Sequence, residues 1–168
     1  VRQALSLALD RNVIVNEATG TGEIAATGYV PNGVFNTDRK TDFRTEGGNL
    51  YNTASDMSKA KELAKGKKGT LTVTYLVPTN EFTLKNYGKK IDYTGIYENV
   101  AKKAGEYWKS LGFTIKYKGL SPDAYATALK TRDYDIIGVN VISGSADALN
   151  YLAPFAKEFS GTGVVVDN

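Results

Sequence analysis

The sequence YDIIGVNVISGSAD, from Tyr134 to Asp147, decides the fold. Its apolar residues come close together without regular alternation, and they are Ile136, Ile137, Val139, Val141 and Ile142. Such a run predicts a β-strand over residues 136–142 that is buried on both faces. The small residues Ser143, Gly144 and Ser145 follow, and a helical pattern then runs from Ala148 to Lys157. A buried strand, a small-residue turn and a helix in this order are typical of the ligand-binding edge of open α/β proteins.

Two further strands precede this stretch. Residues Thr70 to Val77 alternate apolar side chains with threonines, and Phe113 to Tyr117 alternate in the same way, which predicts a strand in each case. A long helical pattern covers Thr94 to Leu111, and Ser121-Pro122-Asp123 predicts the capped start of another helix. The order β-α-β-α-β-α predicts an α/β fold with a mainly parallel sheet and helices on both faces.

The N-terminal part predicts helices and a long loop. Residues 4–9 carry a helical apolar stripe, and Asp10 is placed to cap a second short helix that Gly20 closes. Ser55 is expected to cap a helix that ends before Gly66. Residues 26–54 are rich in glycine and asparagine and predict a long wrapping loop, a feature that is usually functional.

Composition limits the chemistry that this chain can perform. The 168 residues include neither cysteine nor histidine, which rules out disulfides, thiol catalysis and Cys/His zinc sites. No histidine can activate a serine, and Asp147 has no second carboxylate at a fixed spacing. The net charge of +3 is too small to indicate nucleic-acid binding. We therefore expect a binding protein that is not an enzyme and that uses no cofactor or metal.

One short motif matches a nucleotide-binding pattern. The segment GTGEIA, from Gly20 to Ala25, has the form G-x-G-x-x-A of dinucleotide-binding loops. That pattern requires a preceding strand and a following helix. Here the preceding residues have a helical pattern, and Pro31 and Gly33 interrupt the residues that follow. A nucleotide site is therefore not predicted.

The carboxyl ends of the three predicted strands define the expected ligand site. In a parallel sheet they meet at one edge, which brings together residues 78–81, 120–122 and 142–147. Tyr29 and Tyr125 are expected as walls of this site. Asp147 has two interpretations, because a carboxylate directly before a helix at Ala148 either caps that helix or contacts the ligand. Ser143 and Ser145 are expected mainly to form the turn, and hydrogen bonding to a ligand is their secondary expected role.

Several segments carry a resemblance to a known family. They are VRQALSLALDRNVIV (1–15), GYVPNG (28–33), SDMSKAKELA (55–64), NVAKKAGEYWKSLGFTIKY (99–117), DAYATALKTRDYDIIGVN (123–140) and ADALNYLAPF (146–155). In this order they resemble the extracellular solute-binding proteins of family 5, which serve oligopeptide and dipeptide ABC transporters. The helix from Arg2 to Arg11 and the R-D-Y-D sequence from Arg132 to Asp135 are the most specific parts.

The resemblance implies a fold and a function. Residues 1–168 are expected to be a single α/β lobe of the type II periplasmic-binding-protein fold, as a fragment of the C-terminal lobe of a two-lobed protein. The other lobe, the hinge strands and the lipoprotein signal are expected to be missing from this fragment. The parent would capture oligopeptides in the interlobe cleft and deliver them to a membrane permease. It would lie outside the cell, as a cell-surface lipoprotein or in the periplasm. The expected ligand-binding residues are Tyr29, Asn140, Ile142, Ser143, Gly144, Ser145 and Asp147.

One departure from the family pattern affects the ligand. Peptide binders of this family often carry an aromatic residue followed by D-Y-x-D-P, whose first Asp holds the amino terminus of the peptide. Here Gly144 stands in place of that Asp, and Asp147 matches the second acid. Either the ligand is held differently, or Asp147 has taken the role, or the ligand lacks a free amine. An oligosaccharide is the alternative ligand, and nickel or haem held by histidine cannot be anchored here.

Overall fold

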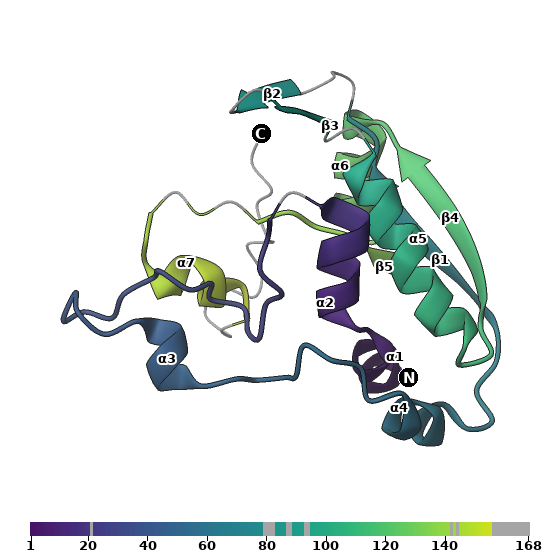
Figure 1. Ribbon diagram of the computed structural model, residues 1–168. Helices are drawn as coiled ribbons and strands as arrows, with labels where there is room; N and C mark the ends of the chain where they lie inside the picture. Colours follow the sequence, from purple (N-terminus) through teal and green to yellow (C-terminus); the bar gives the residue numbers. More distant parts are fainter. Residues whose placement is uncertain are drawn as a thin grey trace. The chain divides into compact units, whose positions relative to one another are not determined.

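The computed structural model describes residues 1–20, 22–78, 83–86, 89–92, 95–141, 143 and 145–155. Figure 1 traces the chain through its elements. The chain forms two compact units. The first combines Val1–Ala25 with Thr53–Gly138, and the second combines Ala26–Asn52 with the residues from Val139 onward. Both units are therefore built from segments that lie far apart in the sequence.

The first unit is built on a three-stranded parallel sheet in the order β4-β1-β5. The central strand β1 (Thr70–Leu76) pairs along its whole length with β4 (Thr114–Leu120). On its other side, β1 pairs with β5 (Ile136–Ile137) through Val73 and Thr74. The parallel directions predicted for the three strands are confirmed, although β4 begins and ends later than the predicted strand over residues 113–117.

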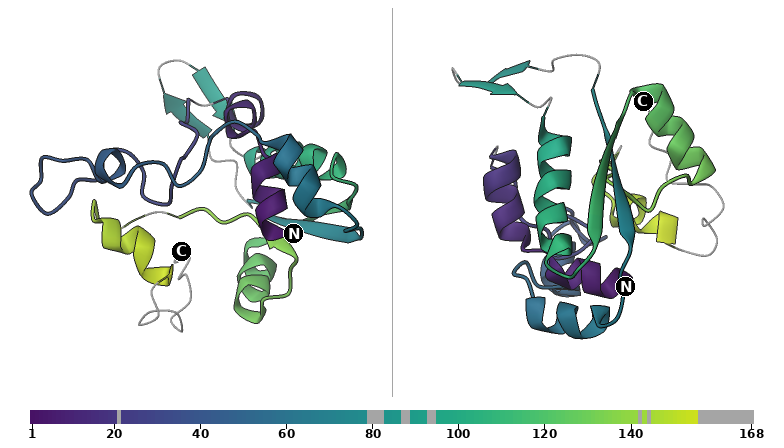
Figure 2. Two further views of the ribbon diagram at one scale, coloured as in Figure 1. Left: turned by 90° about the horizontal axis from the view of Figure 1, so that it is seen from below. Right: turned by 90° about the vertical axis from the view of Figure 1, so that its right-hand side faces the viewer.

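Helices cover both faces of this sheet. Helix α5 (Ile96–Lys109) lies between β1 and β4 in the chain and ends just before β4. Helix α6 (Pro122–Thr131) connects β4 to β5. Since the second crossover runs back past β1 to the opposite edge, right-handed connections place the two helices on opposite faces. The right-hand view of Figure 2 shows α5 and α6 on either side of β1 and β4. The predicted α/β architecture is confirmed.

The third strand is much shorter than predicted, and the expected burial on both faces is wrong. Beyond Ile137 only the amide of Gly138 still bonds to β1 among the described residues, donating to the carbonyl oxygen of Thr74 at 3.1 Å. Val139 is 41% exposed and Val141 is 52% exposed. The apolar run suggested neighbours on every side, but within the described residues β5 is an edge strand that pairs with β1 alone.

A carboxylate fixes the position of β5 against β1. The side chain of Asp135 accepts a hydrogen bond from the backbone amide of Thr72 at 2.8 Å, one residue before the paired residues of β5. Just upstream, Arg132 ends α6 in the left-handed conformation, with φ of 59°. The R-D-Y-D sequence therefore ends a helix at its first residue and fixes strand pairing at its last.

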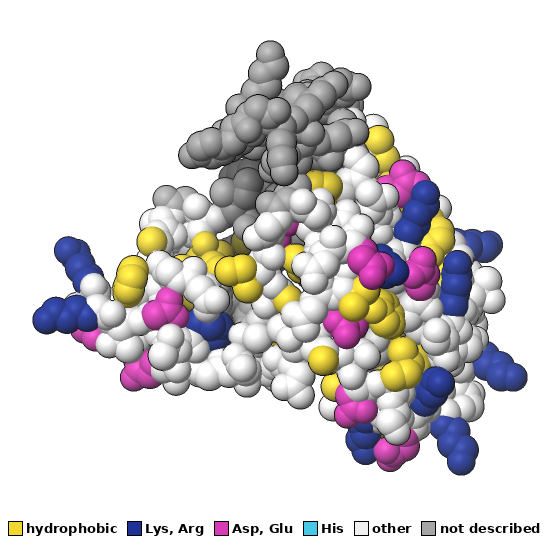
Figure 3. All heavy atoms as spheres, in the orientation of Figure 1, with side chains coloured by type: hydrophobic (Ala, Val, Ile, Leu, Met, Phe, Trp, Pro, Cys, Tyr) yellow, Lys and Arg dark blue, Asp and Glu magenta, His cyan; other side chains and the backbone are white. Residues whose placement is uncertain are grey.

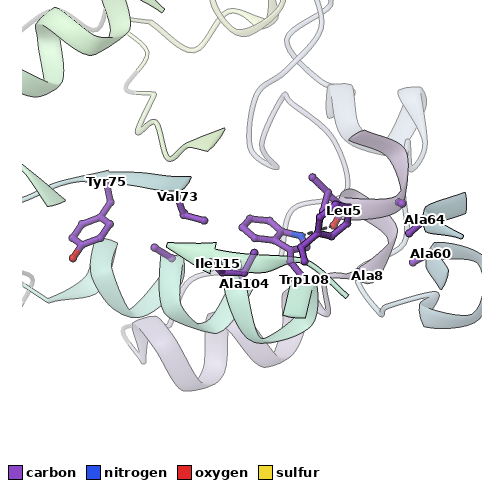
Figure 4. Packing of buried hydrophobic residues seen from close by; sticks show 12 residues of the cluster. Leu5, Ala8, Ala60, Ala64, Val73, Tyr75, Ala104, Trp108 and Ile115 are labelled. Carbon is purple, nitrogen blue, oxygen red and sulfur yellow. Dashed lines mark hydrogen bonds between the residues drawn. The ribbon is translucent and has the colours of Figure 1, made fainter. Parts of the chain in front are cut away.

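The core of the first unit joins its N-terminal helix to the sheet. Trp108 of α5 is buried, and its indole Nε1 donates to the carbonyl oxygen of Leu5 at 2.9 Å. Leu5 belongs to α1 (Arg2–Ala8), which packs closely against α4 (Met57–Ala64) through buried alanines. Figure 4 shows the indole between the sheet residues and this alanine contact. The cluster consists of Ala4, Leu5, Ala8, Ala60, Ala64, Val73, Tyr75, Ala101, Ala104, Trp108, Phe113 and Ile115.

Short helices complete the N-terminal part of this unit. Asp10 caps α2 (Arg11–Ile14) by accepting from the amide of Val13 at 3.0 Å, which confirms the predicted cap. The π-helix η1 (Val15–Thr19) follows and ends at Gly20, whose φ is 64°. The predicted cap of α4 is wrong by one residue. Asp56, and not Ser55, accepts from the first turn, because its carboxylate reaches the amide of Lys59 at 2.9 Å.

The charged surface of the first unit mixes both signs. Lys59 pairs with Glu62 at 2.9 Å, and Lys103 pairs with Glu17 at 2.7 Å and with Glu106 at 3.1 Å. Figure 3 shows the dark blue cationic side chains interspersed with magenta acidic ones over α4 and α5. The lysines thus form a solvated surface with local pairing.

A β-hairpin of β2 (Thr83–Asn86) and β3 (Lys89–Asp92) lies between β1 and α5 in the sequence.

The second unit contains little regular structure. Its helical elements are α3 (Phe43–Gly47), α7 (Ala148–Leu152) and the 3₁₀ turn η2 (Ala153–Phe155). The helix predicted over residues 148–157 is confirmed as far as Leu152 and continues as a 3₁₀ turn, while residues 156 and 157 lie outside the described residues. Apart from α3 and one bridge between Phe35 and Asp42, residues 26–52 are irregular.

Gly105 offers a test of the α5–sheet packing. A Cβ at this position would lie 2.2 Å from the hydroxyl oxygen of Tyr117 on β4 and 2.9 Å from its Cζ. Alanine would favour the helix by about 1 kcal/mol, but overpacking typically costs about 1–3 kcal/mol. We expect Gly105→Ala to lower the free energy of unfolding, as measured by chemical denaturation.

The matched control removes the clashing oxygen. In a Tyr117→Phe background, Gly105→Ala should cost clearly less than in the native background, because the closest atom is gone. An equal cost in both backgrounds, or stabilisation by the single substitution, would contradict this packing.

Candidate functional site

The carboxyl ends of β1 and β4 meet at one edge of the sheet. Leu76 lies opposite Leu120, and the amide of Val77 donates to the carbonyl oxygen of Leu120 at 2.8 Å. Helix α6 starts immediately afterwards at Pro122, with Ser121 at the cap position but without a side-chain cap hydrogen bond. This part of the predicted edge is confirmed within the first unit. Residues 79–81 of the predicted edge lie outside the described residues.

Gly138 is the last fixed point before the candidate ligand segment. Its amide bonds to Thr74, and its carbonyl oxygen accepts from the hydroxyl of Tyr125 at 2.5 Å. After this double attachment the chain enters the second unit with Val139, Asn140 and Val141, all exposed. A stretch with exposed side chains, outside any helix or strand, therefore begins directly after this anchored residue.

Tyr125 does not form an open wall of a site, contrary to expectation. It is 6% exposed, and burial raises the pKa of its phenol above the usual value. Its position on the inner face of α6 explains this, since the ring packs into the protein and the hydroxyl is used by Gly138. Tyr125 is a structural residue that fixes the exit from β5.

The predicted small-residue turn holds itself together. The hydroxyl of Ser143 donates to the carbonyl oxygen of Ser145 and accepts from the amide of Ser145 at 3.3 Å. The hydroxyl of Ser145 in turn accepts from the side-chain amide of Asn150 on α7 at 2.5 Å. Ile142 and Gly144, two of the predicted ligand-binding residues, lie outside the described residues. The hydroxyls at this turn thus support the start of α7.

Asp147 caps α7. Its carboxylate accepts from the amide of Leu149 at 2.8 Å, and its carbonyl oxygen accepts from the amide of Asn150 at 3.1 Å. The capping interpretation is therefore confirmed. The side chain is exposed, so a contact with a ligand stays a prediction.

Tyr29 forms an exposed aromatic pair with Phe155. The ring centroids lie 4.4 Å apart with planes tilted by 39°, and the two residues are 54% and 63% exposed. Figure 3 shows yellow hydrophobic side chains at the surface near α7. The pair joins two parts of the second unit that are far apart in sequence, and its exposed faces are suited to contact apolar groups or sugar rings.

Two residues of the second unit were missed by the sequence analysis. Asp42 organises the loop by accepting from the amides of Gly33 at 2.6 Å, Arg44 at 2.8 Å and Thr45 at 3.1 Å. Its acidic side chain before a short helix was a readable capping signal. Arg44 is buried at 8% exposure. No local pattern indicates burial of an arginine in a polar loop.

Neither a metal-ligand cluster nor a membrane-spanning helix is found in the described part of the chain. No group of three or more His, Cys, Asp or Glu side chains is placed to hold a metal ion there. Nor does that part contain a helix with the length and hydropathy needed to span a bilayer.

Comparison with protein families identifies the class further. The family described as bacterial extracellular solute-binding proteins, family 5 Middle, matches residues 1–163. The chain belongs to this family. Among proteins with curated descriptions, none matches the chain.

Solved structures share this fold. The substrate-binding domain of an oligopeptide ABC transporter from Bacillus anthracis str. Ames has a TM-score of 0.74 at 22% identity, over 96% of this chain and 29% of that one. Listeria monocytogenes OppA bound to peptide has a TM-score of 0.75 at 18% identity, over 99% and 31%. A dipeptide binding protein from Pseudoalteromonas sp. SM9913, in complex with Met-Leu, has 0.68 at 13%, over 91% and 27%. At these identities the likeness shows the fold, and the chain spans less than a third of each of these structures.

Asp42 gives a prediction for the loop of the second unit. Hydrogen bonds from Gly33, and then from Thr45, hold the pKa of this carboxyl below its ordinary value of 3.8. A lowered pKa means that the stabilisation is present above pH 3.8 and is lost as the pH falls through the lower folded value. Asp42→Ala should therefore weaken amide-exchange protection at Gly33 and Thr45 at neutral pH, and native protein should lose it on acidification.

The control is Asp56→Ala, which removes a cap of the same kind from α4 in the first unit. It should leave the protection of Gly33 unchanged. Unaltered exchange at Gly33 in the Asp42 variant would show that the loop is held by other contacts.

Proposed function

We propose that this chain is the ligand-binding region of a receptor that captures oligopeptides for import by an ABC transporter. The observation that carries the proposal is the family match over residues 1–163. The fold shared with an OppA protein bound to peptide supports it. Because the chain spans about 30% of such relatives, the receptor would be longer, with the ligand held in a cleft between this region and a second lobe.

The segment after β5 is suited to bind a peptide backbone. The chain leaves the sheet at Gly138, and Val139, Asn140 and Val141 are exposed and outside any helix or strand. An extended peptide can add to such a segment through main-chain hydrogen bonds, while side-chain pockets supply selectivity. We assign the ligand contacts to the second unit, at Tyr29, Asn140, Ile142, Ser143, Gly144, Ser145 and Asp147.

The receptor would not hold the amino terminus of its peptide through an acidic side chain at position 144, because that residue is Gly144. Asp147 is engaged in capping α7. Backbone groups and apolar contacts would therefore contribute most of the affinity. The protein would act without catalysis, as a cell-surface lipoprotein or a periplasmic protein that delivers its ligand to a membrane permease.

An oligosaccharide is the second candidate ligand. The exposed pair of Tyr29 and Phe155 favours it, because exposed aromatic faces suit sugar rings as well as apolar side chains, and Tyr29 adds a hydroxyl. The absence of an acidic anchor at Gly144 is compatible with either ligand.

Calorimetry separates the two candidates. The full-length receptor that contains this chain should bind members of a library of short peptides and give no heat with oligosaccharides. Binding of oligosaccharides without any peptide signal would reject the peptide proposal. Substituting Tyr29 by Ala should weaken binding in either case, with Phe35→Ala as a control for loss of another exposed aromatic ring of the second unit.

Substitutions of Asp147 separate its capping role from a contact with a peptide amine. Asn caps helices about as well as Asp, whereas Ala typically costs about 1 kcal/mol. We expect Asp147→Asn to bind peptides with native affinity and Asp147→Ala to bind more weakly through loss of the α7 start. A large loss in the Asn variant, restricted to peptides with a free amine, would instead assign the amine anchor to Asp147.

A further inference from the structure

Arg44 is a cation buried in the second unit. It lies in α3 and is 8% exposed, and its Nε is fully buried with no hydrogen-bond partner among the described residues. Arginine stays charged at any physiological pH, so burial cannot be relieved by loss of a proton. A buried charge of this kind is strongly unfavourable unless an anion pairs with it.

The backbone around the guanidinium is shaped to fit it. A Cβ at Gly28 would lie 1.9 Å from Nη1 of Arg44, and a Cβ at Gly47 would lie 2.8 Å from Nη2. A side chain at either position would push the guanidinium out of its present place, so the two glycines leave room for it. On a third side the ring of Phe43 lies 5.7 Å from Cζ, a distance suited to a cation–π contact. Arg44 is thus held in a fitted socket.

The acidic residues nearest in sequence are engaged elsewhere. The carboxylate of Asp42 accepts from three backbone amides. That of Glu46 accepts from the side chain of Asn36. No ion pair joins Arg44 to any carboxylate in the part of the chain that the structure describes. The described residues therefore provide the socket and its charge but not the anion.

An aromatic surface adjoins this socket along the chain. Gly28, which contacts the guanidinium, is followed directly by Tyr29, whose ring pairs with Phe155. Both rings are more than half exposed. A ligand that carries a carboxylate next to an apolar group would match a buried guanidinium beside exposed aromatic rings.

We propose that Arg44 binds a carboxylate of the captured ligand, within the second unit. This inference rests on the proposed peptide-binding function and names the group that the receptor recognises. The carboxylate comes either from the free C-terminus of the peptide or from an acidic side chain. The planar guanidinium offers two parallel N–H donors to a carboxylate, an arrangement that a lysine ammonium cannot reproduce.

The test is calorimetry on the full-length receptor with matched peptides. One set has a free C-terminus, a second is C-terminally amidated, and a third is amidated but carries one Glu. We expect native receptor to prefer a carboxylate-bearing set over the plain amide by about tenfold or more, since hydrogen bonds between charged groups are the strong ones. Preference for the first set would identify the C-terminal carboxylate as the group that is bound. Preference for the third set would identify an acidic side chain.

Variants then test whether Arg44 causes the preference for carboxylate-bearing peptides. Arg44→Gln should abolish discrimination between the acid and the amide, and Arg44→Lys should reduce it. Arg39→Gln, which removes an exposed arginine of the same loop, should keep native discrimination. If Arg44→Gln fails to fold, Arg44→Lys decides, because it keeps the positive charge and loses the two parallel donors, so native discrimination in this variant would reject the role of Arg44.

Peptide binding without any acid preference would overturn the inference and leave the proposed function standing. The role of Arg44 would also be rejected if its variants kept the native ratio, or if they lost stability while discrimination stayed intact, because the partner would then be a carboxylate of the receptor itself. Absence of all peptide binding would reject the inference together with the function on which it rests.

Discussion

The hydrogen bond from the indole of Trp108 to the carbonyl oxygen of Leu5 joins the two ends of the first unit's core, across 103 residues of sequence. An indole N–H buried without a partner would be costly, so the bond fixes where the ring lies and which face of α1 meets it. The alanines of α1 and α4 allow those helices to approach closely, which leaves the large ring to fill the space beside the sheet. The positions of β1 and β4 depend on this packing, because Val73 and Ile115 belong to the same cluster.

From this core the chain is guided to the candidate ligand segment by a few polar contacts. Asp135 holds the start of β5 against Thr72, and Tyr125 holds its end through Gly138. Both contacts satisfy backbone groups at a sheet edge, where strand pairing is short. These two contacts fix Asp135 and Gly138 at the two ends of β5, and the exposed residues that follow belong to the second unit.

The second unit depends on side chains that replace secondary structure. Asp42 satisfies three amides of a loop that has almost no regular hydrogen bonding, and the Ser143–Ser145 turn performs a similar role at the start of α7. Within this framework Arg44 is the exception, since its Nε is buried and satisfies no group among the described residues. Because Arg44 is buried and no ion pair reaches it in the described part of the chain, it is the group of this unit that most requires an anion.

The sequence by itself determined the order of the three parallel strands and of the helices between them, the cap at Asp10, and the absence of thiol and imidazole chemistry, while it left Asp147 open between two roles. These features depend on contacts within a few residues or on composition, so they can be read locally. Only the tertiary structure decided that Val139 and Val141 are exposed, that Tyr125 is buried and that Arg44 lies close to Gly28 and Gly47. Each of those outcomes depends on which distant segment of the chain covers a residue. The hydrophobic pattern of one segment does not say which other segments will pack against it.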